Sequence, residues 1–120
     1  MKYVIHYHYL ISSEHYDLML EKKSYLETWQ IKKKDFIIFC QGENVTAKPI
    51  KDHAKKYLLY DGELGGQKGA IEQYDFGQYW LKSKSDNKII YLIKGPNLNG
   101  NLILEKHKES KWYIQYKNKG

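Results

Sequence analysis

The sequence contains no arginine, since all 20 of its basic residues are lysines. With 14 acidic residues, the 120-residue chain has a formal net charge of +6 and a pI of about 9.2. A positive field of this size favours an anionic partner, such as nucleic acid or a membrane surface. An AT-rich genome would produce the same excess of lysine. The charge therefore does not identify the partner by itself.

Cysteine is also scarce, and Cys40 is the single example. One cysteine excludes an internal disulfide and a cysteine-based zinc site. Because Cys40 ends the apolar run FIIFC, we expect it to be buried in the core. No apolar run approaches the roughly 20 residues of a membrane span, and no signal peptide precedes the first patterned residues. These absences predict a cytoplasmic protein without a membrane partner.

Proline and glycine are few, with two and nine residues, and no linker, repeat or low-complexity tract divides the chain. We therefore expect a single domain over residues 1–120, which is long enough for one hydrophobic core. Tyrosine is abundant by contrast, with 12 residues. Tyrosine favours strands and half-buried surfaces, so its abundance indicates a β-rich protein.

Short runs rich in Tyr, Ile, Val and Leu recur between turn signals, and several alternate polar with apolar residues. The runs expected to be strands are 2–10, 15–21, 25–31, 36–40, 70–80, 88–94, 101–106 and 111–117. Turns are expected at 84–87, 95–97, 99–101 and 109–110, with one helical turn within 51–58. This pattern predicts an all-β fold, a barrel or a sandwich, and we expect a compact antiparallel β-barrel of about eight short strands with little helix.

His15 and Asp17 are the first candidates for a metal site. Residues i and i+2 of a strand face the same side, so both side chains point to one face. A hairpin through Ser12 and Ser13 would pair the preceding strand with this one and place His8 near both. Two imidazoles and one carboxylate are a common ligand set for Mn, Fe or Zn with open positions. A metal that catalyses hydrolysis needs such positions for water or a substrate oxygen.

The spacing leaves alternatives open at this site. Surface strands often carry isolated histidines, so these side chains could be ordinary solvated ones. His6 shares a strand face with His8, and either histidine could be the ligand. His107 lies in the charged turn EKHKES and is expected to be solvated.

His53 and Tyr57, in KDHAKKYLLYDGEL, form the second candidate pair. Residues four apart share one face of a helical turn, and both side chains can donate hydrogen bonds to a phosphate oxygen. A polar loop with an inward-packed tyrosine is the alternative. The glycine-rich stretch GELGGQKGAIEQYDFGQYW lacks the strand-then-helix context of a phosphate loop. Its glycines are expected to serve turns and a bulge.

Several blocks, in order, resemble the 3′-phosphoesterase domain of bacterial and archaeal DNA ligase D. They are HYDLMLE with LETWQI, DHAKKYLLYDGEL, GAIEQYDFGQYW and NGNLILEKHKESKWYIQYK, and the resemblance extends from Tyr3 to about Lys117. It implies a compact barrel that binds a divalent metal, above all Mn²⁺, with Zn²⁺ or Co²⁺ as alternatives. It also implies a partner, the 3′ end of a DNA primer-template or duplex. Such an enzyme removes phosphates and ribonucleotides there in end-joining repair, leaving a 3′-hydroxyl for a ligase.

The resemblance also implies roles for individual residues. By position, His8, His15 and Asp17 would bind the metal. His53 and Tyr57 would be the catalytic residues that contact the phosphate. Any metal-assisted hydrolysis would then combine a metal-bound water with these two side chains.

The sequence departs from the family pattern at several positions. Met19 stands where the family has an arginine that would hold a phosphate with two parallel hydrogen bonds. Lys51 replaces an acidic residue, and Lys51 and Lys55 would have to supply the missing positive charge to the phosphate. The aromatic positions Trp29 and Trp80 are expected to be structural.

The family's N-terminal extension, which serves ribonucleotide removal, does not precede the first strand here. Phosphate removal is therefore expected to survive better than ribonucleotide removal. The departures also leave an alternative function, a catalytically weakened module that binds DNA ends by charge and stacking. A further alternative is a pseudoenzyme that docks to a separate DNA ligase or polymerase.

Overall fold

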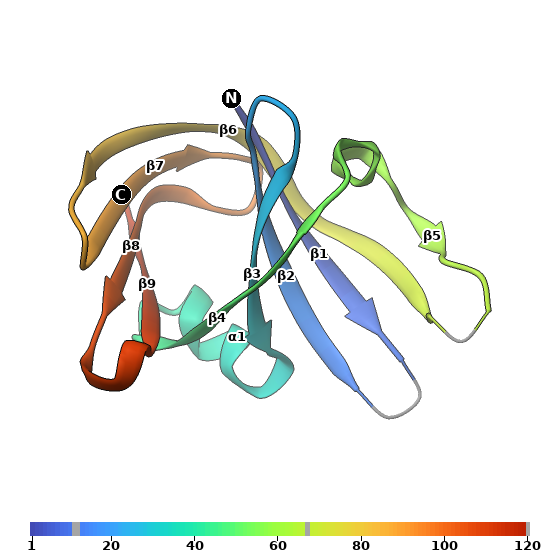
Figure 1. Ribbon diagram of the computed structural model, residues 1–120, viewed down its shortest axis with the longest axis horizontal. Coiled ribbons are helices and arrows are strands. Elements are labelled where there is room, and N and C mark those ends of the chain that lie inside the picture. Colours follow the sequence, from blue (N-terminus) through green and yellow to red (C-terminus); the bar gives the residue numbers. More distant parts are fainter. Residues whose placement is uncertain (11–12, 67, 120) are drawn as a thin grey trace.

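The strands of this protein pair one after another until the sheet closes on itself. The computed structural model describes residues 1–10, 13–66 and 68–119 (Figure 1). The strands are β1 (Lys2–Tyr9), β2 (Glu14–Glu21), β3 (Leu26–Lys32), β4 (Val45–His53), β5 (Gly62–Glu63), β6 (Ala70–Lys84), β7 (Lys88–Lys94), β8 (Asn99–Lys106) and β9 (Trp112–Asn118). Three short helices accompany them: α1 (Lys33–Cys40), η1 (Lys55–Leu59) and η2 (Lys108–Ser110).

The sheet order is β1-β2-β3-β4-β9-β8-β7-β6-β5, and β1 also pairs with β6. This extra pairing closes the strands other than β5 into a ring, and all the pairings are antiparallel. The long strand β6 curves from β5 on one side of the molecule to β7 on the other (Figure 1). The expected all-β antiparallel fold is confirmed. Within the described part of the chain, no helix is long and apolar enough to cross a membrane.

The main hydrophobic core lies inside the ring. Every strand of the ring contributes side chains to one buried cluster, for example Tyr3 and Ile5 from β1, and Leu18 and Leu20 from β2. Because strand side chains alternate, the residues between these face outward. On β1 and β2 the outward face is covered as well, and Met19 is buried there. A second apolar layer therefore lies outside the ring at this point.

The run FIIFC is helical, so the prediction of a strand at 36–40 is wrong. In α1 the buried side chains are Phe36 and Phe39, three positions apart on one helix face, while Ile37 is exposed. Five consecutive apolar residues fit a buried strand and a helix turn equally well, and here the packing of the two rings decides. Phe36 stacks on Tyr16 with centroids 3.7 Å apart. Cys40 is only partly buried, at the edge of the core.

Strand β4 was not predicted, because its exposed positions are polar and Pro49 interrupts the pattern. The helical turn expected within 51–58 begins later, as η1, and residues 51–53 complete β4. The turns at 84–87, 95–97 and 109–110 are confirmed, and Glu109 and Ser110 adopt φ values of 65° and 61°. Residues 99–101 instead begin β8. The expected hairpin between β1 and β2 forms, although Ser12 lies outside the described residues.

Candidate metal centre

The pairing of β1 with β2 positions the first candidate residues. His8 lies directly opposite His15 in the antiparallel register, and His6 lies opposite Asp17. All of them belong to the outward-facing set, because the inward set fills the core of the ring. The hairpin therefore gathers three imidazoles and one carboxylate on a single face.

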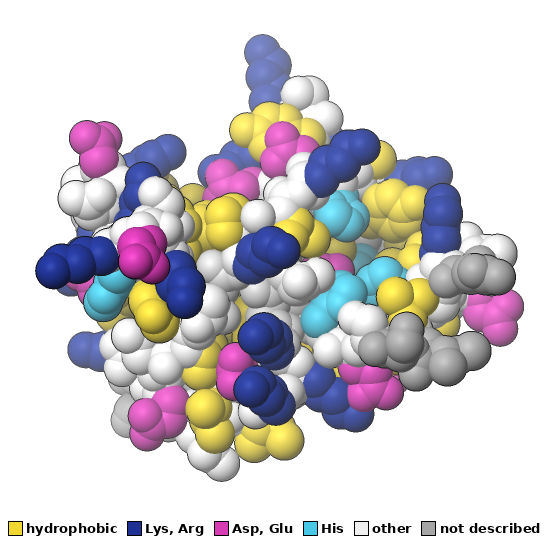
Figure 2. Space-filling view, turned by 60° about the horizontal axis from the view of Figure 1, so that its bottom comes forward, with side chains coloured by type: hydrophobic (Ala, Val, Ile, Leu, Met, Phe, Trp, Pro, Cys, Tyr) yellow, Lys and Arg dark blue, Asp and Glu magenta, His cyan; other side chains and the backbone are white. Residues whose placement is uncertain are grey.

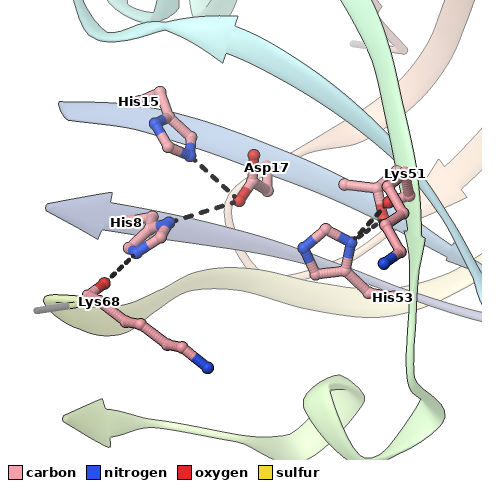
Figure 3. A network of polar contacts seen from close by, with 7 residues as sticks. His8, His15, Asp17, Lys51, His53 and Lys68 are labelled. Carbon is pink, nitrogen blue, oxygen red and sulfur yellow. Dashed lines mark hydrogen bonds and ion pairs between the residues drawn. The ribbon is translucent and has the colours of Figure 1, made fainter. Parts of the chain in front are cut away.

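Three of these residues come close enough to share an ion. His15 Nε2 is 3.3 Å from Asp17 Oδ2, and His8 Nδ1 is 3.9 Å from the same oxygen (Figure 3). One ligand atom from each residue lies within 4.8 Å of the others. Ligand atoms that each lie about 2.1 Å from one ion are separated by roughly 3–4 Å. The structure thus brings together the expected ligands His8, His15 and Asp17, and a small closing of the longest separation would let them hold one divalent cation.

A backbone oxygen fixes the orientation of His8. Its Nε2 is 2.7 Å from the carbonyl oxygen of Lys68, on the segment that leads into β6. A carbonyl can only accept, so Nε2 carries the proton and the neutral ring keeps Nδ1 free as a ligand. Metal-binding histidines characteristically donate their other ring N–H to such an acceptor. Figure 3 shows this arrangement, with Nδ1 turned toward Asp17.

His6 is close by but does not join the ligand set. Its side chain is completely buried, and neither ring nitrogen has a hydrogen-bond partner among the described residues. Desolvation by burial lowers its pKa from 6.5 to about 4, against the opposing charge of Asp17, so the ring is neutral at pH 7. Between the two histidines left open by the sequence, the structure places His8 in the cluster.

His53 and Tyr57 line the same pocket as His8 and Asp17. His53 ends β4, and Tyr57 belongs to η1, with the two ring centroids 6.2 Å apart. His53 Nδ1 is 2.9 Å from the carbonyl oxygen of Lys51 and 3.1 Å from Thr28 Oγ1. Because the carbonyl must accept, Nδ1 carries the proton. The remaining nitrogen, Nε2, points toward the side of Asp17 (Figure 3).

The two groups share one pocket with a volume of about 340 Å³. Its polar lining consists of His8, Asp17, His53, Tyr57 and Lys68, and its apolar lining of Leu10, Met19, Leu64 and Ile71. The space-filling view shows several histidine side chains close together in a hollow of this face, with lysines around them, while another histidine lies apart at the left (Figure 2). The sequence placed these polar side chains in separate segments, and the fold brings them to one cavity.

The lysines expected to contact the phosphate have other surroundings than Lys68. Lys51 contributes its carbonyl to His53, while its exposed side chain does not line the pocket. Lys55 Nζ is 3.3 Å from Glu21 Oε2 and is therefore paired elsewhere. Lys68, which sequence reasoning missed, lines the pocket instead. In the sequence, the glycines around Lys68 indicate a tight turn of the chain. They do not indicate that this turn borders the pocket.

Met19 and the two tryptophans occupy contrasting environments. Met19 is buried against Val4 and forms part of the apolar wall of the pocket, so this side chain cannot hold a phosphate by hydrogen bonds. Trp29 is buried in the core, as expected of a structural residue. Trp80 differs from it, since 46% of its surface is exposed, and a purely structural role for Trp80 stays a prediction. His107 is exposed in a charged turn, as predicted.

Comparison of the sequence with models of known protein families and with curated proteins finds no match. The assignment of a function therefore depends on the geometry of the pocket and on the resemblance of the sequence blocks.

Proposed function

We propose that the protein is a metal-dependent phosphoesterase that removes phosphate groups from the 3′ ends of DNA and leaves a 3′-hydroxyl. One observation supports this most directly. The ligand atoms of His8, His15 and Asp17 converge, and His8 and Asp17 line one pocket together with His53 and Tyr57. A metal with open positions next to hydrogen-bond donors for a phosphate is the arrangement that phosphoester hydrolysis requires.

The proposed metal site uses Nδ1 of His8, Nε2 of His15 and Oδ2 of Asp17. The mixed nitrogen and oxygen set suits Mn²⁺ and also admits Zn²⁺ or Co²⁺. When bound, such an ion polarises a phosphate oxygen and supplies a water molecule of lowered pKa. The Lys68 carbonyl holds the His8 ring in the tautomer that binds metal.

His53 and Tyr57 act on the phosphate in this proposal. The hydrogen bond from Nδ1 to the Lys51 carbonyl fixes the ring, so that Nε2 is the atom that faces the substrate. In its protonated form, Nε2 donates a hydrogen bond to the phosphate or passes a proton to the leaving oxygen. The Tyr57 hydroxyl donates a second hydrogen bond, and the Lys68 ammonium supplies positive charge.

The experiment is the release of inorganic phosphate from a 3′-phosphorylated primer-template in the presence of Mn²⁺. We expect release by the wild type and a loss of at least about 100-fold in His15→Ala, because one metal ligand is removed. His107→Ala is the matched control, since this exposed histidine lies outside the pocket. Release that is equal in the wild type and in His15→Ala would overturn the proposal.

A second candidate is a module that binds DNA ends and has lost the chemistry. Met19 favours it, because an apolar wall stands where a phosphate-holding arginine would assist catalysis. Calorimetric titration with Mn²⁺ separates the two functions, since the enzyme must bind the metal and the module need not. A separate DNA ligase or polymerase would be the natural partner of either.

A further inference from the structure

The exposed Trp80 marks a second site on the outer surface of the ring. It lies on the outward face of β6, opposite Leu92 of β7, with Asn101 and Lys117 next in the same row across β8 and β9. The core does not use this large aromatic side chain, and 46% of its surface is exposed. An exposed indole ring is available for a contact with something outside the chain. The metal pocket does not include Trp80.

A hollow adjoins the indole ring. It has a volume of about 340 Å³ and is lined by Trp80, Leu92, Ile93, Lys94, Asn99 and Lys119. Trp80 and Leu92 give it an apolar wall, while two ammonium groups and one side-chain amide provide donors. The hollow therefore combines a flat aromatic surface with positive charge within one small space.

The neighbouring positions carry the same charge. Lys94 lies opposite Gln78 of β6, and Gln78 lies opposite Lys2 of β1. Within the described register, no acidic residue is paired with Lys94 or with Trp80. Lys82 also reaches across this surface, with Nζ 3.2 Å from Asn101 Oδ1. Lys2, Lys82 and Lys94 thus add positive charge to this surface, and Glu21, which accepts a hydrogen bond from the main-chain N–H of Lys2, adds one negative charge at its edge.

We propose that this hollow, the Trp80 pocket, binds one base of a single-stranded nucleic acid. The base stacks on the indole, and the phosphates on either side of it meet the ammonium groups of Lys94 and Lys119. Aromatic platforms flanked by cations are the general means by which proteins hold single strands without reading their sequence. A second copy of the chain is a poorer occupant, because it carries the same net charge and the apolar wall is small.

The position of the Trp80 pocket relative to the metal pocket is consistent with one bound strand. Both lie on β6, since Ile71 lines the metal pocket and Trp80 follows nine residues later, roughly 30 Å along the strand. Phe76, which is also exposed, lies between them. The base-binding proposal nevertheless stands without the phosphoesterase activity, because stacking needs neither the metal nor a 3′ phosphate.

The test is the binding of a fluorescein-labelled oligothymidylate of about ten nucleotides, within the range of a single-strand binding site, measured by anisotropy in EDTA so that no metal contributes. We expect Trp80→Ala to weaken binding about 5- to 100-fold, as the removal of one stacking platform does. We also expect unlabelled oligonucleotide to quench tryptophan fluorescence in the wild type and much less in Trp80→Phe. Ile37→Ala, an exposed apolar residue of α1, is the matched control and should bind as the wild type does.

The double variant Lys94→Ala with Lys119→Ala tests the charge. Its affinity should depend less steeply on salt, with the logarithmic slope reduced by about 0.7 for each phosphate that the variant no longer neutralises. Lys34→Ala, an exposed lysine of α1, should leave the slope nearly unchanged.

Equal affinity of Trp80→Ala and the wild type would overturn the proposal. So would a wild-type dimer in sedimentation that Trp80→Ala dissociates, because the surface would then bind protein. Phosphate release plays no part in either readout, so failure of the phosphoesterase proposal would be seen separately.

Discussion

His8 and His15 face each other across the β1–β2 hairpin, with ring centroids 4.9 Å apart and planes at 76°. This edge-to-face arrangement leaves one nitrogen of each ring next to the same oxygen of Asp17. The two imidazoles and the carboxylate therefore offer a divalent cation three ligand atoms on one face of the hairpin. Metal binding at this site can therefore be tested by substituting each ligand in turn.

Binding of Mn²⁺ should stabilise the folded protein. A ligand at about 100 times its dissociation constant adds about 2.7 kcal/mol to the free energy of unfolding, which raises the melting temperature of a domain of this size by several degrees. We expect this shift in the wild type, its reversal by EDTA, and its loss in His15→Ala. The His107→Ala variant should shift as the wild type does. A shift that persists in His15→Ala would place the metal elsewhere.

The position of the Lys68 carbonyl should depend on Gly69, the next residue, whose φ of 80° favours glycine. A Cβ at Gly69 would lie 2.2 Å from the carbonyl oxygen of Tyr9, so Gly69→Ala must displace the segment that holds His8. We expect Mn²⁺ affinity to fall about 10- to 100-fold, as it does when a partner that orients a ligand is removed. Calorimetry measures it.

Gly65→Ala is the control for this prediction, because Gly65 also has a φ of 80° but no atom of the described residues lies within 4 Å of its Cβ position. Both variants place a side chain at the same φ, while only Gly69→Ala forces a Cβ against the Tyr9 carbonyl beside the segment that holds His8. Equal Mn²⁺ affinities in the two variants would contradict the role of the carbonyl.

Lys68 should also serve catalysis through its side chain. Lys68 lines the pocket, and Lys68→Met removes its ammonium; we expect the kcat/KM of phosphate release to fall by roughly 10-fold, since removal of one charged donor destabilises the transition state. Lys55→Met removes an equal charge that is paired with Glu21. Its effect should be clearly smaller. A larger effect in Lys55→Met would restore the assignment made from the sequence.

Alkaline pH should destabilise the protein through its buried tyrosines. Burial raises the pKa of Tyr79 to about 12, and its hydroxyl donates a 2.6 Å hydrogen bond to the carbonyl of Glu21. A raised pKa means that the folded state holds the proton longer than the unfolded state. This contribution is complete below about pH 10 and diminishes as the pH rises from about 10 to about 12, at up to about 1.4 kcal/mol per pH unit.

Urea unfolding at about pH 9 and about pH 11, on either side of the ordinary tyrosine pKa, measures this contribution. The free energy of unfolding should differ less between the two pH values in Tyr79→Phe, which has no hydroxyl proton to lose. The difference should stay unchanged in Tyr9→Phe, where the ring is exposed. An unchanged difference in Tyr79→Phe would show that other groups carry the whole effect.

The sequence predicted what depends on local alternation and failed where tertiary contacts decide. The pairing of His8 with His15 followed from a short hairpin and the two-residue period of strands. The helix over FIIFC did not, because its geometry is set by the packing of Phe36 and Phe39 inside the ring. Lys68 was missed for a similar reason, since the pairing of β6 with β1 brings its segment beside His8 of the β1–β2 hairpin.

The direction of the Trp80 side chain could not be predicted from the sequence. Its sequence pattern is that of an ordinary strand residue, and nothing local distinguishes an aromatic side chain that enters the core from one that faces water. The bulge where β6 pairs with β1, between Ile5 and His6, shifts the alternation along β6. The outward direction of Trp80 could therefore not be read from its position in the run.

The most direct measurement of the central claim is a crystal structure of the protein grown with Mn²⁺, with the anomalous signal recorded near the manganese absorption edge. We predict one peak that lies about 2.0–2.3 Å from His8 Nδ1, His15 Nε2 and Asp17 Oδ2 together. A peak bound by His6 instead of His8, or no peak at this face of the hairpin, would contradict it.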